Sequence, residues 1–139
     1  MDFHEVTAQD IEFMAKNSLC PEIYKHREEQ IDYCFALSHE DKTLGIGGFR
    51  MITNTTYFTW FDLSKAAYEN NIIVCYRTIR EKMESFAKEK GIILMMAYVR
   101  VGFEAGIHTA QHLGFNLECR LNRFLGEDPA DLYLKYFGD

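Results

Sequence analysis

Two histidines separated by four residues are the first candidates for chemistry in this sequence. His108 and His112 stand in the stretch HTAQHLGF, and on a helix this spacing places both imidazoles on one face, ~6 Å apart. Such a pair can share a metal ion or supply a general acid or base near neutral pH. Thr109 stands where zinc proteases carry a glutamate, although Glu104 is one turn away. An ordinary, half-buried helix face is the third interpretation.

A cysteine and a run of glycines are the next residues of chemical interest. Cys75 stands near the start of a predicted helix, where the helix dipole lowers a thiol pKa. A buried, unreactive thiol is the alternative. Gly45, Gly47 and Gly48 are interspersed with large apolar residues, which places them inside a strand and not in a phosphate-binding loop. We expect these glycines to mark a bulge or a close approach of two backbones.

The elements that must position these residues follow from the period of the hydrophobic pattern. Helical stripes are formed by Ile11, Met14, Ala15 and Leu19, and by Ile72, Tyr76, Ile79, Met83, Phe86 and Ala87. The order predicts an α/β (α+β) fold in which a mixed central sheet of six or seven strands is flanked by about four helices. Strands are expected at 3–6, 33–37, 44–52, 57–63, 92–99, 117–125 and 132–137. Helices are expected at 7–19, 21–29, 72–90 and 104–113.

Composition indicates one domain over residues 1–139. The chain has 47% hydrophobic residues, 2 prolines and a net charge of −6, which argues against disorder and against general nucleic-acid binding. No apolar run resembles a signal peptide or a bilayer span, so we expect a cytoplasmic protein that does not bind membranes. The four cysteines are widely spaced, which favours reduced core thiols over disulfides or a zinc site.

Three segments follow one another in a characteristic order. The first is the three-strand meander that ends at 57–63. The second is the helix that ends in Lys88-Glu89-Lys90-Gly91, before the apolar run 92–99. The third is the segment His108–Phe115 ahead of 117–121, with its helix, Leu-Gly-Phe, strand arrangement. Together they resemble the GNAT family of N-acetyltransferases, and in layout the resemblance covers almost the whole chain. It implies a single GNAT-like domain.

The resemblance also implies where coenzyme A would bind. In the family, an Arg/Gln-x-x-Gly-x-Gly/Ala motif lets backbone amides at the start of the long helix approach the pyrophosphate. The matching positions are 71–76, which hold no glycine and would crowd a phosphate with β-branched side chains. Acetyl-CoA is therefore the expected cofactor only if the chain is an active enzyme. The cofactor-binding candidates are Leu63, Val74, Cys75 and Tyr76.

The family's general acid is missing as well. Active members often carry a tyrosine about four residues before the glycine that ends the last helix, and here that residue is Ala110. The resemblance leaves Asp62 as the candidate base, with His112, His108 or Tyr98 as the acid, and no metal.

Asp62 and the end of the apolar strand have structural alternatives. In the family, the acceptor amine lies beside the end of the strand that contains Asp62, so this carboxylate is placed to accept a proton from an ammonium group. A turn hydrogen bond with Ser64 or Lys65 is the alternative. Tyr98 and Arg100 are expected to line the same cleft, where Arg100 suits a phosphate or carboxylate. A surface salt bridge with Glu104 is the alternative for Arg100.

The departures from the family pattern favour a GNAT-fold protein that has lost acetyl transfer and works by binding a partner. Chain length, Trp60-Phe61 and the long-helix layout resemble GNAT-like proteins of tailed bacteriophages, which implies a phage or prophage setting, in the host cytoplasm or the virion. The alternative is an acetyl-CoA-dependent N-acetyltransferase acting on a primary amine. We expect a protein partner or a homodimer through the C-terminal strands, because edge strands and an aromatic content of 14% favour association.

Overall fold

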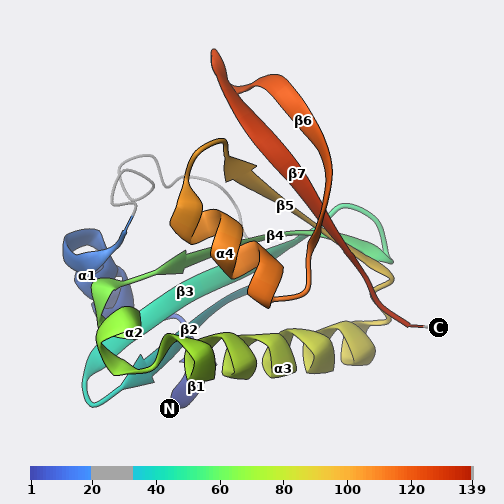
Figure 1. Cartoon of the computed structure of the whole chain (residues 1–139). Coiled ribbons are helices and arrows are strands. Elements are labelled where there is room, and N and C mark those ends of the chain that lie inside the picture. Colours follow the sequence, from blue (N-terminus) through green and yellow to red (C-terminus); the bar gives the residue numbers. More distant parts are fainter. Residues whose placement is uncertain (20–32, 139) are drawn as a thin grey trace. The chain divides into compact units, whose positions relative to one another are not determined.

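The computed structural model describes residues 1–19 and 33–138. In these residues, seven strands form one mixed sheet in the order β1-β2-β3-β4-β5-β7-β6, accompanied by four helices (Figure 1). The α+β class is therefore confirmed, while the predicted helix at 21–29 lies outside the described residues. The strands are β1 (Asp2–Glu5), β2 (Tyr33–His39), β3 (Lys42–Met51), β4 (Thr56–Leu63), β5 (Leu94–Arg100), β6 (Asn116–Leu125) and β7 (Asp128–Tyr136). The helices are α1 (Ala8–Asn17), α2 (Lys65–Asn70), α3 (Ile72–Lys90) and α4 (Glu104–His112).

The chain divides into two compact units. The first unit comprises Met1–Arg50 and Trp60–Cys75, and the second comprises Met51–Thr59 and Tyr76–Asp139. Each unit has its own packed interior.

The first unit is built around the meander β2-β3 and helix α1. Thr7 caps α1 in a capping box with Asp10, which satisfies two free backbone amides at the helix start. Met14 from α1 is fully buried against Ala36 and Ile46. Ala15, which the sequence placed on the apolar stripe, is exposed. The stripe prediction was wrong for Ala15, because the polar residue Asp10 occupies part of the helix face that points into the core.

Asp10 is buried because polar groups surround its carboxylate. The Thr43 hydroxyl donates to one oxygen at 2.7 Å, and the Thr7 backbone amide donates to the other at 2.9 Å. The His4 Nε2 atom lies 2.8 Å from the same oxygen. Burial disfavours the charged form, but these hydrogen bonds outweigh it and lower the pKa of Asp10. The carboxylate thereby joins β1, α1 and β3.

Two glycines of β3 allow a close approach to β4, as the sequence suggested. A Cβ atom on Gly45 would lie 2.9 Å from the Asp62 carbonyl oxygen and 2.7 Å from a Leu63 methyl carbon. A Cβ atom on Gly47 would lie 2.7 Å from the Phe61 ring. Any larger side chain at these positions would push the backbone of β4 away.

From Tyr76 onward, α3 belongs to the second unit and packs on one face of its strands. The helix begins at Ile72 and ends at Lys90 as predicted, and Gly91 follows it with a φ of 68°. Met83 and Ala87 are buried, and the rings of Phe86 and Tyr57 contact each other edge to face at 6.0 Å.

Strand β5 starts two residues later than the sequence suggested, at Leu94. It pairs with β4 in parallel from Leu94 to Met96 and with β7 in antiparallel along its whole length. Met95 and Ala97 are buried on one face, while Leu94, Met96 and Tyr98 on the other are only half buried. The apolar run therefore alternates in burial, which the sequence alone did not reveal.

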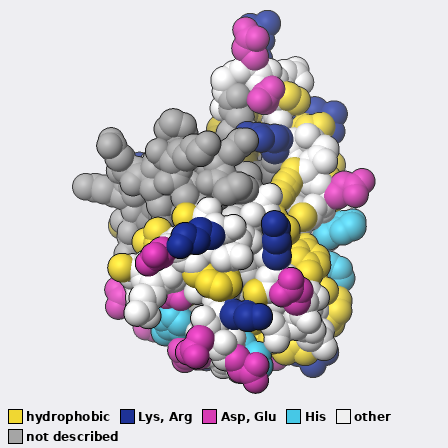
Figure 2. Space-filling model, turned by 90° about the vertical axis from the view of Figure 1, so that its left-hand side faces the viewer, with side chains coloured by type: hydrophobic (Ala, Val, Ile, Leu, Met, Phe, Trp, Pro, Cys, Tyr) yellow, Lys and Arg dark blue, Asp and Glu magenta, His cyan; other side chains and the backbone are white. Residues whose placement is uncertain are grey.

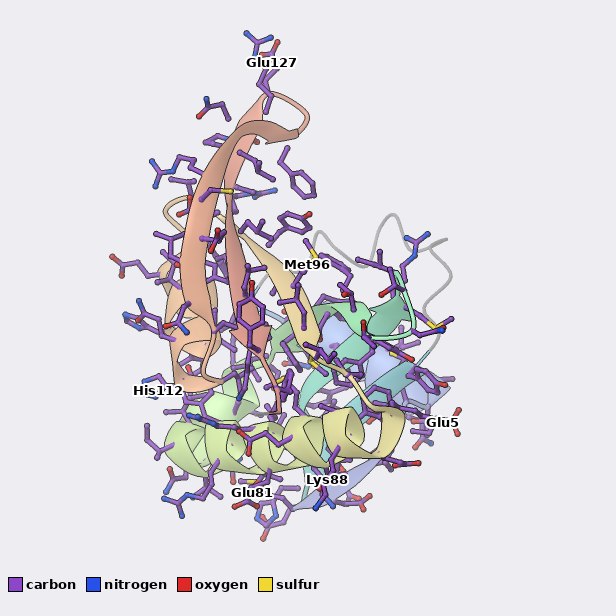
Figure 3. The ribbon with its side chains drawn as sticks, turned by 90° about the vertical axis from the view of Figure 1, so that its right-hand side faces the viewer. Glu5, Glu81, Lys88, Met96, His112 and Glu127 are labelled. Carbon is purple, nitrogen blue, oxygen red and sulfur yellow. The ribbon has the colours of Figure 1, made fainter. Side chains whose placement is uncertain are left out.

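Strands β6 and β7 form a long antiparallel hairpin with a tight turn. Leu125 pairs with Asp128, which leaves only Gly126 and Glu127 in the turn. The sequence pattern ended one strand at Leu125 and started the next at Leu132, so that it predicted a longer connection. Pro129 was the misleading residue, although proline is compatible with the beginning of a strand. Figure 3 shows Glu127 at the tip of the hairpin, on the opposite end from α3.

Two further features complete the fold. Helix α2 was not predicted, because a six-residue segment is too short to show a helical period. No helix in the described part of the chain combines the length and apolarity that crossing a membrane requires.

Candidate functional site

The start of α3, where the family's pyrophosphate would bind, is capped by the chain itself. The backbone amide of Val74 donates to the side-chain oxygen of Asn71 at 3.2 Å. The backbone amide of Cys75 donates to the main-chain oxygen of Asn71 at 3.1 Å. The first of these bonds takes up one of the amides that a phosphate would need at a helix N-terminus, and the second is the ordinary first hydrogen bond within the helix. Val74 is half buried, and Ile73 is 49% exposed beside it.

Helix α2 stands directly before this position, where the sequence showed only a long polar connection. Ala66 and Ala67 are buried. The thiol of Cys75 is completely buried, 4.0 Å from the Ala67 carbonyl oxygen. Burial raises the pKa of this thiol, because it disfavours the thiolate. Cys75 is thus a core residue, and the nucleophile interpretation is not supported.

Asp62 is held inside the first unit by the end of α1. Its side chain is 5% exposed, and the Ser18 hydroxyl lies 2.9 Å from one carboxylate oxygen and 2.7 Å from the other. Ser64, one of the two predicted turn partners of Asp62, instead donates its hydroxyl to the Thr43 carbonyl oxygen at 2.7 Å. A long-range partner that is 44 residues away could not be identified from the sequence.

In the second unit, the structure brings Tyr76 and His112 together. The two rings are nearly parallel, with an interplanar angle of 8° and 4.7 Å between centroids. Tyr76 is 5% exposed, as its place on the apolar stripe predicted, whereas His112 is exposed. The hydroxyl oxygens of Thr109 and Tyr76 lie 3.5 Å apart. Figure 3 shows His112 beside α3.

His108 is exposed on α4, one turn before His112. Within residues 1–19 and 33–138, no three histidine, cysteine, aspartate or glutamate side chains gather in a way that could hold a metal ion. Of the two histidines, His112 is the one whose ring stacks on Tyr76.

Tyr98 belongs to a row of aromatic rings in the second unit. Its ring lies 5.2 Å from that of Phe58 and stacks at 4.0 Å on Phe124, which is 42% exposed. The row joins β4, β5 and β6. Of the other predicted site residues, Leu63 is buried at the end of β4 in the first unit, and Arg100 is exposed at the end of β5.

The surface carries charges of both signs. On the face drawn in Figure 2, lysine and arginine side chains are interspersed with aspartate and glutamate. This mixture agrees with the net charge of −6 and gives the described part of that face no extended basic area of the kind that binds a phosphate backbone.

A cluster of charged residues on α3 and β7 was not predicted from the sequence. Lys135 is 7% exposed, and its ammonium lies 3.1 Å from Glu84 and 2.7 Å from the Leu113 carbonyl oxygen. A signal existed: Lys135 shares its strand face with Tyr133, so strand alternation alone placed the lysine toward the interior.

Comparison with known proteins identifies the fold. No family model matches the chain, and no curated protein matches it. Solved structures do match over nearly the full length. Ard1 from Thermoplasma volcanium has a TM-score of 0.74 at 12% identity, covering 99% of this chain and 98% of that one. Aminoglycoside 6'-acetyltransferase type Ii has a TM-score of 0.72 at 16% identity, with coverages of 98% and 97%. A GNAT-family acetyltransferase from Bacillus anthracis has a TM-score of 0.71 at 11% identity, with coverages of 96% and 93%.

The class of protein follows from this likeness and from the element order. The chain has the GNAT fold, and its described residues show the acetyltransferase-like arrangement of seven strands and four helices. At identities this low the likeness describes the fold and does not carry an activity with it.

Proposed function

We propose that this GNAT-fold protein works by binding a partner and does not transfer acetyl groups. One observation carries the proposal: the side-chain oxygen of Asn71 occupies the Val74 amide at the start of α3. Ile73 and Val74 add β-branched bulk where a pyrophosphate needs small residues. A ligand would have to displace an internal cap that contributes about 1 kcal/mol to helix stability.

The candidate catalytic groups support the same proposal. A general base must reach the proton it removes, within hydrogen-bond distance, and the Asp62 carboxylate is 5% exposed and bound by the Ser18 hydroxyl. Ala110 replaces the tyrosine that serves as the acid in many GNAT enzymes. His112, a possible replacement, is stacked on Tyr76.

The C-terminal hairpin offers the surface for a partner. Leu117 is 59% exposed, Phe124 is 42% exposed and Tyr136 is 70% exposed, and β6 is an edge strand. Exposed apolar side chains at a sheet edge are features of association surfaces. A second copy of this chain or another protein is the expected partner. The length of the chain and its Trp60-Phe61 pair support a phage or prophage setting.

Acetyl-CoA-dependent transfer to a primary amine is the alternative, and calorimetry separates the two. We expect no binding heat with acetyl-CoA at concentrations up to about 1 mM. A dissociation constant above about 1 mM corresponds to a binding free energy of less than about 4 kcal/mol. Micromolar binding by the wild-type chain, or acetylation of a primary amine, would contradict the proposal.

Asn71→Ala is the matched control, because it frees the Val74 amide and leaves the bulky side chains in place. If this variant binds acetyl-CoA and the wild type does not, the block is located at Asn71. If neither the wild type nor the variant binds acetyl-CoA, the side chains of Ile73 and Val74 are sufficient to prevent binding. Both results support the proposal.

A further inference from the structure

A groove in the second unit lies apart from the residues expected to bind coenzyme A or to transfer an acetyl group. It has a volume of about 840 Å³ and lies between the C-terminal half of α3, the connection from Gly91 to Ile93, and the end of β7. This volume is in the range of small-molecule sites. Figure 3 shows α3 crossing the base of the β6–β7 hairpin on this side of the molecule.

The charges that line the groove are mostly positive, although the whole chain is acidic. Among the described residues of its lining, Arg80, Lys88 and Lys135 are the cations and Glu84 is the one acid. The groove thus has a charge of about +2 in a chain of net charge −6. Such a local excess of positive charge favours an anionic ligand.

Glu84 holds two of these cations in place. Its Oε1 atom accepts from Lys135 Nζ at 3.1 Å and from Arg80 Nε at 3.1 Å. The hydrogen bond from Lys135 lowers the pKa of Glu84, so the carboxylate stays charged. Burial lowers the pKa of Lys135, and Glu84 partly offsets this effect. Because Arg80 uses Nε for Glu84, the Nη edge of its guanidinium is turned elsewhere.

The face of that guanidinium lies over Gly114. A Cβ atom on Gly114 would be 3.1 Å from Arg80 Nη2, 3.2 Å from Arg80 Cζ and 2.9 Å from Lys135 Nζ. Gly114 is required for the end of α4, since its φ is 90°. The missing side chain has a second effect: it lets the guanidinium and the ammonium both lie close to this glycine, where a Cβ atom would displace them.

The rest of the groove is apolar and open. Ile93 is 54% exposed and Tyr136 is 70% exposed. Phe137 lines the same wall, and the Lys135 ammonium lies 5.3 Å from the centre of its ring. An ion-pair network that only joined α3 to β7 would not require large exposed apolar residues beside it.

We propose that this groove binds a carboxylate carried on an apolar body, either a small aromatic acid or the free C-terminal carboxylate of a peptide. The Nη edge of Arg80 takes the carboxylate within the groove, Lys135 supplies the second charge beside Gly114, and Ile93 and Tyr136 cover the apolar body. Arg80 suits a planar carboxylate. A singly charged ligand is preferred to a dianion, because Glu84 borders the site. Such binding goes beyond the proposed function and does not depend on whether coenzyme A binds.

The test is a titration followed by NMR amide shifts, using 4-phenylbutyrate and its neutral amide as a matched pair. We expect the acid to bind and to shift the Gly114 amide, and the amide to bind at least tenfold more weakly, as expected for the loss of a charge-assisted contact. N-acetylated dipeptides that end in phenylalanine, as the free acid and as the C-terminal amide, form the second arm. Tighter binding of the peptide acid than of phenylbutyrate identifies a chain end as the ligand, and the reverse order identifies a small acid.

Variants locate the site. Arg80→Gln is expected to weaken binding of the acid about tenfold, and Arg77→Gln, an exposed arginine of the same helix outside the groove, to leave it unchanged. Ile93→Ser is a second, surface variant that is expected to weaken binding several-fold without touching the ion pairs. Equal binding of acid and amide, tighter binding of 4-phenylbutylphosphonate than of the carboxylate, an unchanged affinity in both Arg80→Gln and Ile93→Ser, or no binding at about 10 mM acid would each overturn the proposal.

Discussion

His112 lies flat on the ring of Tyr76, so that an exposed residue of α4 covers a buried residue of α3. Stacked aromatic pairs contribute about 0.5–1.5 kcal/mol beyond the area they bury. We therefore expect His112→Ala to reduce the free energy of unfolding by roughly this amount. His108→Ala, on the same helix, should change it by less than about 0.5 kcal/mol. Urea unfolding of the two variants measures the difference, and equal effects would show that the stack adds no stability.

The pH dependence of stability should carry a contribution from His4. Burial alone would lower the pKa of His4, but the hydrogen bond and charge of Asp10, together with Asp2, outweigh it and raise the pKa. A raised histidine pKa gives stability that is complete below the ordinary value of about 6.5 and is lost as pH rises through the folded-state pKa. The pKa of Asp10 is lowered, so its contribution is present above about pH 4 and is lost in acid.

Thermal melting from pH 5 to about 8.5 tests this expectation. The wild type should lose stability across the upper part of this range, and His4→Gln should lose less, because Gln does not titrate. His108→Gln, which replaces an exposed histidine of the second unit, serves as the control and should follow the wild type. Parallel curves for the wild type and His4→Gln would show that the His4–Asp10 contact does not depend on charge.

Gly45 should not tolerate alanine. The added Cβ atom would lie 2.9 Å from the Asp62 carbonyl oxygen, and a backbone atom of a neighbouring strand cannot move as a flexible side chain can. We expect Gly45→Ala to cost about 1–3 kcal/mol of unfolding free energy, as overpacked cores do. Arg50→Ala, at an exposed position of the same strand, is the control. A stability equal to wild type would mean that β3 and β4 separate more easily than this contact suggests.

Opening the start of α3 should not create a coenzyme A site. Val74→Gly combined with Tyr76→Gly removes bulk but costs up to about 2 kcal/mol in helix propensity. It also removes the buried Tyr76 ring and its stack on His112. We expect a lower melting temperature and no response to acetyl-CoA. A rise in melting temperature on adding acetyl-CoA to the variant, absent in the wild type, would reveal a latent site that only these side chains had closed.

Self-association is the fifth expectation. The exposed Leu117 and Phe124 side chains on the edge strand β6 favour a dimer through the C-terminal strands. Light scattering should report a mass of about twice 16.3 kDa. Leu117→Ser with Phe124→Ser should shift the population to monomer. A single 16.3 kDa species at all concentrations would remove this proposal.

The sequence predicted those parts of the fold that depend on local patterns. The helix that begins after Thr7 and the helix from Ile72 to Lys90 are determined by residues three or four positions apart, so both were found. The close approach at Gly45 and Gly47 was also predicted, because glycine weakens a strand interior and is favoured there where two backbones come close. The short helix α2 was not predicted, because six residues are too few to show a helical period. The tight turn at Gly126 was not predicted, because Pro129 favoured a longer loop.

The site was harder to predict, because its contacts join distant parts of the chain. Asp62 and Ser18 are separated by 44 residues, and nothing in their local sequence links them. The cap at Asn71 was within reach, since asparagine three residues before Val74 is a common helix start. The family resemblance predicted a glycine motif at this position. The motif is absent, and Asn71 was not predicted as the cap of the helix.

The two-residue turn at Gly126 and Glu127 also makes the hairpin tip a practical attachment point. Glu127 is exposed at the end of β6–β7 that is opposite α3, and neither turn residue lines the groove. A cysteine placed at position 127, with the exposed Cys119 replaced by serine, would carry a fluorophore away from Arg80 and Gly114. Because the label would lie beside the edge strand β6, its fluorescence would report both dimerisation and the binding of another protein.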